Sequence, residues 1–258
     1  MVTDWPKVRR YGEPFFYRGG DVGCLVVHGF TASPEEVSGL GRHLGGLGYT
    51  VFGPRLPMHA TQVEDMTRAR WWDWYLAAED GYRVLAAQCQ QVVVIGLSMG
   101  GLAVLLLASE HPVAGVVAMG TPLVLDDDIR LRFVRQLAVI KPFLPSRSRE
   151  VREGAAWATR VAYEKTPVHG VAELLAFQRV VQGRLGQVRC PALVLHARHD
   201  LSAPYRNLDL VCDGLGSADK EKVTFERGGH IVTVDVEHEA VFARVAGFVA
   251  RVTASQAK

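Results

Sequence analysis

The stretch Gln91–Gly101, QVVVIGLSMGG, joins an apolar strand-like run to a helical pattern through a single serine. Four β-favouring residues in a row are typical of a strand that is covered on both faces. Ser98 follows, with Gly96 two places before it and Gly100 two places after it. This G-x-S-x-G pattern predicts a sharp turn that exposes the serine, with glycines where side chains would collide with a neighbouring strand or helix. The alternative is a serine that only caps the following helix.

The rest of the chain repeats the alternation of strand and helix. Further strand-like runs span residues 23–29, 49–54, 114–120, 191–197 and 222–226. Helical patterns between and after them span residues 33–44, 71–85, 99–110 and 237–251. This alternation predicts a mostly parallel, doubly wound sheet. A shorter run, 13–19, is predicted to pair antiparallel with the run 23–29 across the turn Gly19–Asp21.

The alternation breaks between Thr121 and Val188, where no strand is predicted. Apolar residues at helical spacing, ended by Pro142, form a stripe made of Ile129, Phe133, Leu137 and Ile140. Residues 154–164 and 171–182 also have helical patterns. The whole segment carries 11 Lys and Arg against 7 Asp and Glu. We therefore predict an α/β core made of residues 1–121 and 188–258, with a basic helical cap inserted at 122–187.

The composition limits the class of protein. The 258 residues are 48% apolar and have a formal net charge of +2, which fits one large domain with an insertion and gives no indication of nucleic-acid binding. The first residues lack the basic and apolar stretches of a signal peptide. The four cysteines form no CxxC pair and have no metal-ligand spacing, and no apolar run reaches the roughly 18 residues of a membrane span. These features favour a cytoplasmic protein with reduced thiols.

Two later strand ends supply the partners that a serine nucleophile needs. Asp200 follows the run 191–197, and His230 follows the run 222–226 after two glycines. The carboxyl ends of parallel strands share one edge of the sheet, where such folds build their sites. The chain order Ser, Asp, His is also the order that accompanies this type of turn. We predict Ser98 as nucleophile, His230 as general base and Asp200 as the acid that orients it.

An oxyanion needs hydrogen-bond donors close to the nucleophile, and backbone N–H groups can supply them. Phe30 directly follows the first long strand, and Met99 begins the helix after Ser98. We predict that these two N–H groups form an oxyanion hole. His28 is better placed to orient the loop that carries Phe30 than to catalyse.

Other residues compete for these roles. Asp126–Asp128 follow the run 114–120 and offer another acid, although three aspartates before a helical stripe are typical of a helix cap. His196 and His199 precede Asp200, which is the wrong chain order for the base. His111 and His238 lie at a helix end and in the last helix, where histidines are more often solvent-facing, and His43 and His169 carry no motif.

Four stretches together resemble the bacterial carboxylesterase and monoacylglycerol lipase group of the α/β-hydrolase superfamily. They read VVHGFTASPEEVSGLGRHLGGLGYTV, GLSMGG, ARHD and GGHIVTVD, and the similarity extends from about Val22 to Val249. The resemblance implies the α/β-hydrolase fold, the same triad and oxyanion hole, and a lid over an acyl pocket. The tripeptide Met58-His59-Ala60 departs from the group, which often has Gly-His-Gly there, so a loop near the site is altered.

The cap offers apolar residues for an acyl pocket. Candidate substrate-binding residues are Phe133, Leu137, Ile140, Phe143, Trp157 and Phe177. The alternative is that they pack the cap onto the core. Basic residues lie among them, namely Arg130, Arg132, Arg135 and Lys141. A basic amphipathic cap could touch an anionic membrane surface transiently, although a solvated charged face is the favoured interpretation.

The predicted reaction is hydrolysis of short- to medium-chain esters, including monoacylglycerols, through an acyl-enzyme and without a metal or organic cofactor. The protein would act as a monomer or a homodimer. Two rival reactions, C–C bond hydrolysis and cofactor-free peroxidase chemistry, can use the same three residues. A non-catalytic small-ligand receptor on the same fold is disfavoured because all three triad positions are filled.

Overall fold

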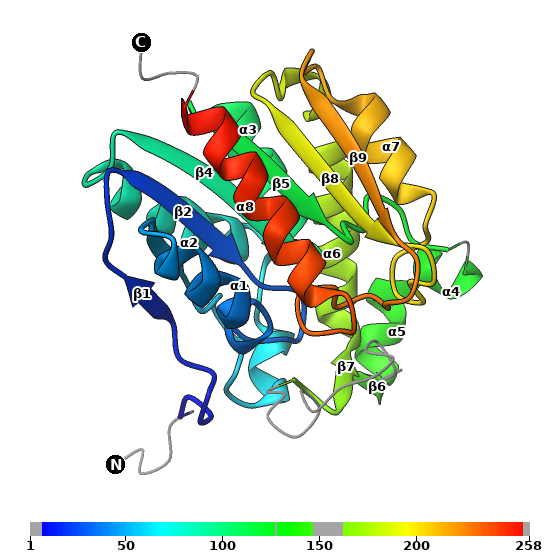
Figure 1. The fold of residues 1–258 in the computed structure, drawn as a ribbon. Coiled ribbons are helices and arrows are strands. Elements are labelled where there is room, and N and C mark those ends of the chain that lie inside the picture. Colours follow the sequence, from blue (N-terminus) through cyan, green and yellow to red (C-terminus); the bar gives the residue numbers. More distant parts are fainter. Residues whose placement is uncertain (1–6, 127, 147–161, 255–258) are drawn as a thin grey trace.

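The structure is a computed structural model that describes residues 7–126, 128–146 and 162–254. Within these ranges a seven-stranded sheet forms the centre, in the order β1-β3-β2-β4-β5-β8-β9 (Figure 1). The strands from β2 onward run parallel to one another, which confirms the predicted doubly wound sheet. The strands are β1 (Phe15–Tyr17), β2 (Val22–Val27), β3 (Thr50–Gly53), β4 (Gln91–Leu97), β5 (Gly115–Met119), β8 (Ala192–Ala197) and β9 (Lys220–Phe225).

Helices cover both faces of the sheet. They are α1 (Glu35–Gly46), α2 (Trp71–Ala86), α3 (Met99–Glu110), α4 (Ile129–Arg132), α5 (Val134–Ile140), α6 (Val168–Gln182), α7 (Asn207–Gly214) and α8 (His238–Ala254), with short 3₁₀ turns η1 (Val63–Thr67) and η3 (Leu185–Gln187). Helices α1 and α8 pack on one face. Helices α2, α3 and α7 pack on the other, where α6 also contacts α2 and α3.

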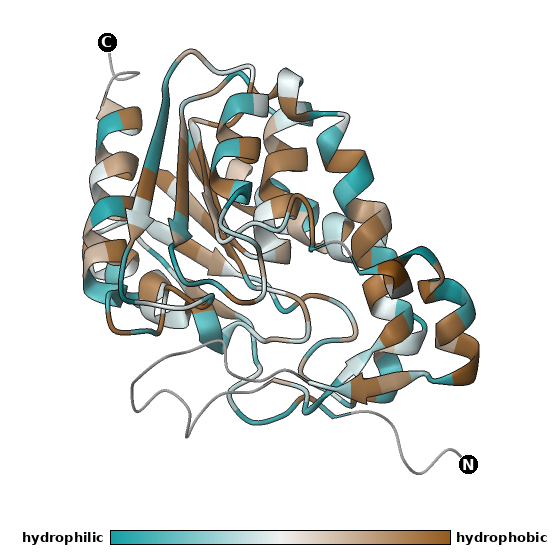
Figure 2. Cartoon of the chain, turned by 90° about the vertical axis from the view of Figure 1, so that its right-hand side faces the viewer, coloured by the Kyte–Doolittle hydropathy of each residue, from teal (hydrophilic) through white to brown (hydrophobic). Residues whose placement is uncertain are grey.

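The pattern of buried residues explains these layers. Successive residues of a strand point to opposite faces, so Val93 and Ile95 pack toward α1 and α8, whereas Val92 and Val94 pack toward α2 and α3. The sequence shows no alternation because both sides are apolar. Helix α3 is buried from Met99 to Ala108 and therefore has no polar stripe. Figure 2 shows the apolar strands in the centre and hydrophilic residues on the outward faces of the helices.

The predicted cap segment lies beyond the carboxyl ends of β5 and β8 (Figure 1). It contains α4, α5 and a two-stranded antiparallel ribbon, β6 (Phe143–Pro145) and β7 (Lys165–Pro167), before α6. The prediction that no strand occurs here is wrong. Each of these strands has three residues and ends in proline, so neither leaves a recognisable apolar pattern. The predicted helix 154–164 lies almost wholly outside the described residues.

The partner predicted for β1 is also wrong. Phe15 pairs antiparallel with Gly53 of β3, not with β2. Both edges of β2 are occupied, because β3 and β4 flank it in the sheet. The turn after β1 is tied to the start of β3 instead, since the N–H of Gly20 donates to the Gly48 carbonyl at 2.7 Å.

No helix among the described residues is long and apolar enough to cross a bilayer. The four cysteines are free thiols. Burial raises the pKa of the Cys190 thiol to about 11, which keeps it protonated at neutral pH. In the ranges that the structure covers, no three His, Cys, Asp or Glu side chains are arranged to hold a metal ion.

Candidate active site

Ser98 stands on a strained turn between β4 and α3. Its backbone has φ 55° and ψ −120°, a conformation that costs a non-glycine residue roughly 1–3 kcal/mol. The glycines on both sides permit this turn. A Cβ at Gly96 would collide with the backbone of Gly100, and a Cβ at Gly100 would collide with the Val27 carbonyl. The turn therefore has the geometry predicted from the G-x-S-x-G pattern.

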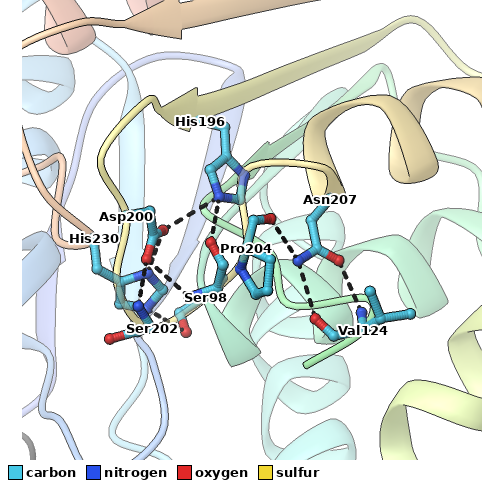
Figure 3. Close-up of polar contacts among 9 residues, drawn as sticks. Ser98, Val124, His196, Asp200, Ser202, Pro204, Asn207 and His230 are labelled. Carbon is cyan, nitrogen blue, oxygen red and sulfur yellow. Dashed lines mark hydrogen bonds and ion pairs between the residues drawn. The ribbon is translucent and has the colours of Figure 1, made fainter. Parts of the chain in front are cut away.

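The fold brings the three predicted triad residues together. His230 Nε2 lies 2.9 Å from Ser98 Oγ, and His230 Nδ1 lies 2.7 Å from Asp200 Oδ2. Ser98 comes from the end of β4, Asp200 from the turn after β8, and His230 from the loop after β9. Figure 3 shows the continuous chain of polar contacts from Ser98 to Asp200. Neither His230 nor Asp200 is more than 9% exposed, so solvent screens their interaction weakly.

The surroundings of Asp200 keep it ionised. Burial opposes the charge, but His230, His196 and the N–H of Ala203 outweigh it and hold the pKa of Asp200 well below its usual range. Asp200 Oδ1 accepts hydrogen bonds from the N–H groups of Ser202 and Ala203, both at 2.8 Å. The carboxylate is thus fixed in place and can orient the imidazole.

His196 is a second imidazole on the same carboxylate, a role that the sequence analysis did not assign. Its Nε2 lies 3.3 Å from Asp200 Oδ2 and 3.0 Å from the Ala203 carbonyl. Both neighbours accept hydrogen bonds, so Nε2 carries the proton. The residue is 1% exposed and packs edge-on against Tyr205. Its position four residues before Asp200 was the available sequence signal.

Two downstream carboxylates hold the loop that carries His230. Glu237 Oε2 accepts the N–H groups of Arg227 and Gly228 at 2.8 and 3.0 Å. Asp235 Oδ2 accepts the N–H of Gly229 at 2.7 Å. Three successive backbone donors are thereby fixed directly before the imidazole. The sequence analysis did not predict these contacts, although Asp235 and Glu237 both lie in the stretch that follows His230.

The predicted oxyanion donors lie beside Ser98. Met99 is the next residue in the chain, at the start of α3. Phe30 follows Gly29, which packs so close to the serine that a Cβ at position 29 would lie 3.2 Å from Ser98 Cβ. Neither the Phe30 N–H nor the Met99 N–H has a hydrogen-bond acceptor among the described residues. The oxyanion role of these two donors stays a prediction.

His28 orients the loop that carries Phe30, as the sequence predicts. The Leu56 N–H donates to His28 Nε2 at 3.1 Å, so the ring proton is on Nδ1, which donates to the Gly29 carbonyl at 2.9 Å. Burial and the neighbouring His59 lower the pKa of His28 well below its ordinary value, so the ring is neutral. His59 stacks edge-on against His28 and Phe30.

The tripeptide that departs from the Gly-His-Gly pattern forms a strained turn at this place. Met58 and Ala60 have φ of 63° and 55°, in the left-handed region that favours glycine. His59 between them is fully buried, and burial lowers its pKa to about 4. The backbone at positions 58 and 60 thus has the conformation that glycine favours, although neither residue is glycine.

The five predicted substrate-binding residues that the structure describes separate into three groups. Phe177 is fully buried and stacks on Trp71 with ring centroids 5.3 Å apart. Leu137 packs in a small cap cluster, and Phe143 is half-buried in β6. Phe133 and Ile140 lie on the surface, 58% and 83% exposed. Trp157 lies outside the described residues.

The competing residues have other surroundings. Asp126 is exposed and lies 3.8 Å from Arg206, so it does not replace Asp200 beside the base. A surface pocket of about 480 Å³ lies between α1 and α8, and its lining includes His43 and His238. His238 Nδ1 contacts the Asp235 carbonyl at 2.8 Å. None of the triad residues lines that pocket.

A mostly parallel sheet with Ser, His and Asp at its carboxyl edge, after a strained strand-to-helix turn, defines the α/β-hydrolase class. The sequence profile of the family described as serine aminopeptidase S33 (Hydrolase_4) matches residues 22–237. The chain belongs to this family of α/β hydrolases and is a hydrolase of the carboxylesterase and lipase type.

Named relatives agree with this placement. A thermostable monoacylglycerol lipase from Bacillus sp. (strain H-257) is 33% identical over 93% of this chain and 94% of its own length. A carboxylesterase from Bacillus subtilis (strain 168) is 28% identical over 89% and 92%. A solved structure described with the metagenome-derived lipolytic enzymes LipS and LipT has a TM-score of 0.90 at 30% identity, over 95% of this chain and all of that one.

Proposed function

We propose that the protein hydrolyses carboxylic esters through an acyl-enzyme on Ser98, with His230 as general base and Asp200 as its partner. The observation that carries the proposal is the unbroken contact chain of 2.9 and 2.7 Å that joins the three side chains. The strained backbone at Ser98 supports it, because strain of this kind gathers at functional sites.

The proposed mechanism has two acyl-transfer steps. His230 Nε2 takes the proton of Ser98 Oγ as the oxygen attacks the ester carbonyl, and the N–H groups of Phe30 and Met99 bind the oxyanion. Each such donor is worth roughly 3–4 kcal/mol in related sites. Asp200 stabilises the imidazolium, which then protonates the departing alcohol. Water, activated by the same imidazole, releases the carboxylic acid and restores Ser98.

For the substrate class we propose short- to medium-chain esters, including monoacylglycerols. The names of the two Bacillus relatives, a monoacylglycerol lipase and a carboxylesterase, support ester substrates that include monoacylglycerols. Apolar cap residues such as Leu137 and Phe143 are available to contact an acyl chain. We also propose that the cap touches anionic lipid surfaces. Val139 and Ile140 are 84% and 83% exposed, with Lys141 adjacent, so an apolar tip is presented next to a positive charge.

Labelling with a fluorophosphonate probe tests the nucleophile. We expect the probe to modify the wild-type protein and Ser109→Ala, a control serine at the far end of α3, but not Ser98→Ala. Labelling of Ser98→Ala would overturn the assignment. Turnover of p-nitrophenyl esters from acetate to laurate tests the reaction. A protein that is labelled at Ser98 yet hydrolyses none of these esters would favour the C–C bond hydrolase or peroxidase alternative instead.

Vesicle sedimentation tests the lipid contact. We expect binding to anionic vesicles but not to zwitterionic ones, and we expect Val139→Ser with Ile140→Ser to weaken it. Equal sedimentation of the double variant and the wild type would contradict the proposed contact surface.

A further inference from the structure

Tyr163 lies in the cap segment, yet its hydrogen bonds go to two loops of the core beside the active site. Its N–H donates to the carbonyl of Thr31 at 3.1 Å. Its phenol donates to the carbonyl of Met58 at 2.8 Å and accepts the N–H of Thr61 at 3.2 Å. The side chain is 3% exposed, and Arg9 stacks over its ring. One cap residue therefore joins both loops.

Both loops that Tyr163 joins contain strained residues. Thr31 has φ 60°, Met58 has φ 63° and Ala60 has φ 55°. Each such backbone costs roughly 1–3 kcal/mol and persists only where surrounding contacts enforce it. Tyr163 bonds the carbonyl of two of these three residues. Without those bonds the loops would lower their conformational free energy by relaxing away from their present positions.

The first of these loops carries the proposed oxyanion donor. Thr31 directly follows Phe30, so the Thr31–Tyr163 bond fixes the chain one residue after the Phe30 N–H. The second loop supports the same residue from the side, because His59 packs edge-on against the Phe30 ring at 6.4 Å. The bonds that Tyr163 makes to the two loops therefore act on the surroundings of Phe30.

A second part of the cap presses on the same residue. A Cβ at Gly170 of α6 would lie 2.8 Å from Phe30 Cζ. The glycine lets the helix approach the Phe30 ring closely. Tyr163 thus holds the main chain next to Phe30, and α6 packs against the Phe30 ring.

We propose that Tyr163 is a positioning residue for the oxyanion hole, through which the cap sets the Phe30 N–H over Ser98. The cap would then contribute to the chemical step as well as to substrate binding. This inference rests on the proposed esterase function, because it requires an oxyanion to form at Ser98.

The test is Tyr163→Phe, which keeps the ring and the N–H but removes the phenol bonds. We expect kcat for p-nitrophenyl butyrate to fall about five- to tenfold, as loss of the partly buried hydrogen bonds of the phenol implies, while KM stays within about twofold. The inhibition constant of an alkyl trifluoromethyl ketone should rise by the same factor, because its carbonyl oxygen becomes an oxyanion when Ser98 adds to it. The matched control is Tyr82→Phe, which loses a partly buried phenol bond to the Pro112 carbonyl away from the site.

Each result is decisive. Unchanged kcat and inhibition constant in Tyr163→Phe, with only the loss of thermal stability seen in Tyr82→Phe, would overturn the inference and leave the esterase proposal intact. Absence of ester turnover in the wild type would instead overturn the proposed function. If Tyr163→Phe does not fold, Gly170→Ala displaces the Phe30 ring independently. We expect the same loss of kcat there, and a folded Gly170→Ala with unchanged kcat would overturn the inference.

Discussion

His28 Nδ1 donates a hydrogen bond to the Gly29 carbonyl at 2.9 Å, and that carbonyl shares its peptide group with the Phe30 N–H. In a trans peptide the two groups point in opposite directions. Holding the carbonyl therefore aims the N–H. We therefore propose that His28, which the sequence does not favour as a catalyst, helps to shape the proposed oxyanion hole.

Two substitutions at His28 distinguish its hydrogen bond to the Gly29 carbonyl from the packing of its ring. Asparagine places an amide nitrogen where Nδ1 stands, so we expect His28→Asn to keep most of kcat. His28→Leu removes the donor, and we expect kcat to fall about tenfold with little change in KM, since the lost interaction matters in the transition state. Steady-state kinetics with one p-nitrophenyl ester measures both. Equal losses in the two variants would argue against the aiming role.

His196, the second imidazole on Asp200, should affect the pH dependence of kcat/KM. His196→Phe keeps the packing against Tyr205 but removes one donor to the carboxylate, so Asp200 should bind the imidazolium of His230 more strongly. We expect the acidic limb of kcat/KM to move to higher pH and kcat to fall. His196→Gln can retain a donor and should shift the limb less. Identical profiles for the two variants would contradict this explanation.

Buried neutral histidines should make the fold sensitive to acid. Burial lowers the pKa of His59 from 6.5 to about 4. Between these values the unfolded chain binds a proton that the folded chain does not, so stability falls as pH decreases from 6.5 to about 4. The difference at His59 corresponds to about 3 kcal/mol of unfolding free energy. Burial lowers the pKa of His28 also, and its effect adds in the same direction.

Urea unfolding between pH 7.5 and 4.5 measures this loss. His59→Asn should flatten the dependence of unfolding free energy on pH, because one titrating group is removed. The matched control for the substitution itself is His43→Asn, because His43 is exposed on the surface of α1. A slope in His59→Asn equal to that of the wild type would show that another group dominates the acid response.

The strain at Ser98 should be measurable as stability. Ser98→Gly and Ser98→Ala both remove the nucleophile, but only glycine adopts φ 55° without cost. We expect Ser98→Gly to be more stable than Ser98→Ala by roughly 1 kcal/mol, even though glycine has more freedom in the unfolded chain. Calorimetric or urea unfolding of the two inactive variants gives the difference. A more stable alanine variant would mean that the turn is not strained.

Local sequence determined the elements that build the site. The glycines around Ser98 prescribe a sharp turn because their missing side chains leave room for close backbone contacts, and this is a property of adjacent residues. Apolar runs of the right length define the parallel strands. Because parallel strands end at a common edge, the sequence predicts that Asp200 and His230, which follow two of these strands, lie near Ser98.

Tertiary structure decided which distant groups meet. The partner of β1, the ribbon of β6 and β7, and the contacts of Tyr163 with Thr61 across 102 positions of the chain have no counterpart in local pattern. The exposed positions of Phe133 and Ile140 likewise depend on how the cap lies on the core. Such pairings follow from how whole layers pack. A short strand could pair with the edge of several other strands, and only the assembled sheet and cap leave one of those edges free.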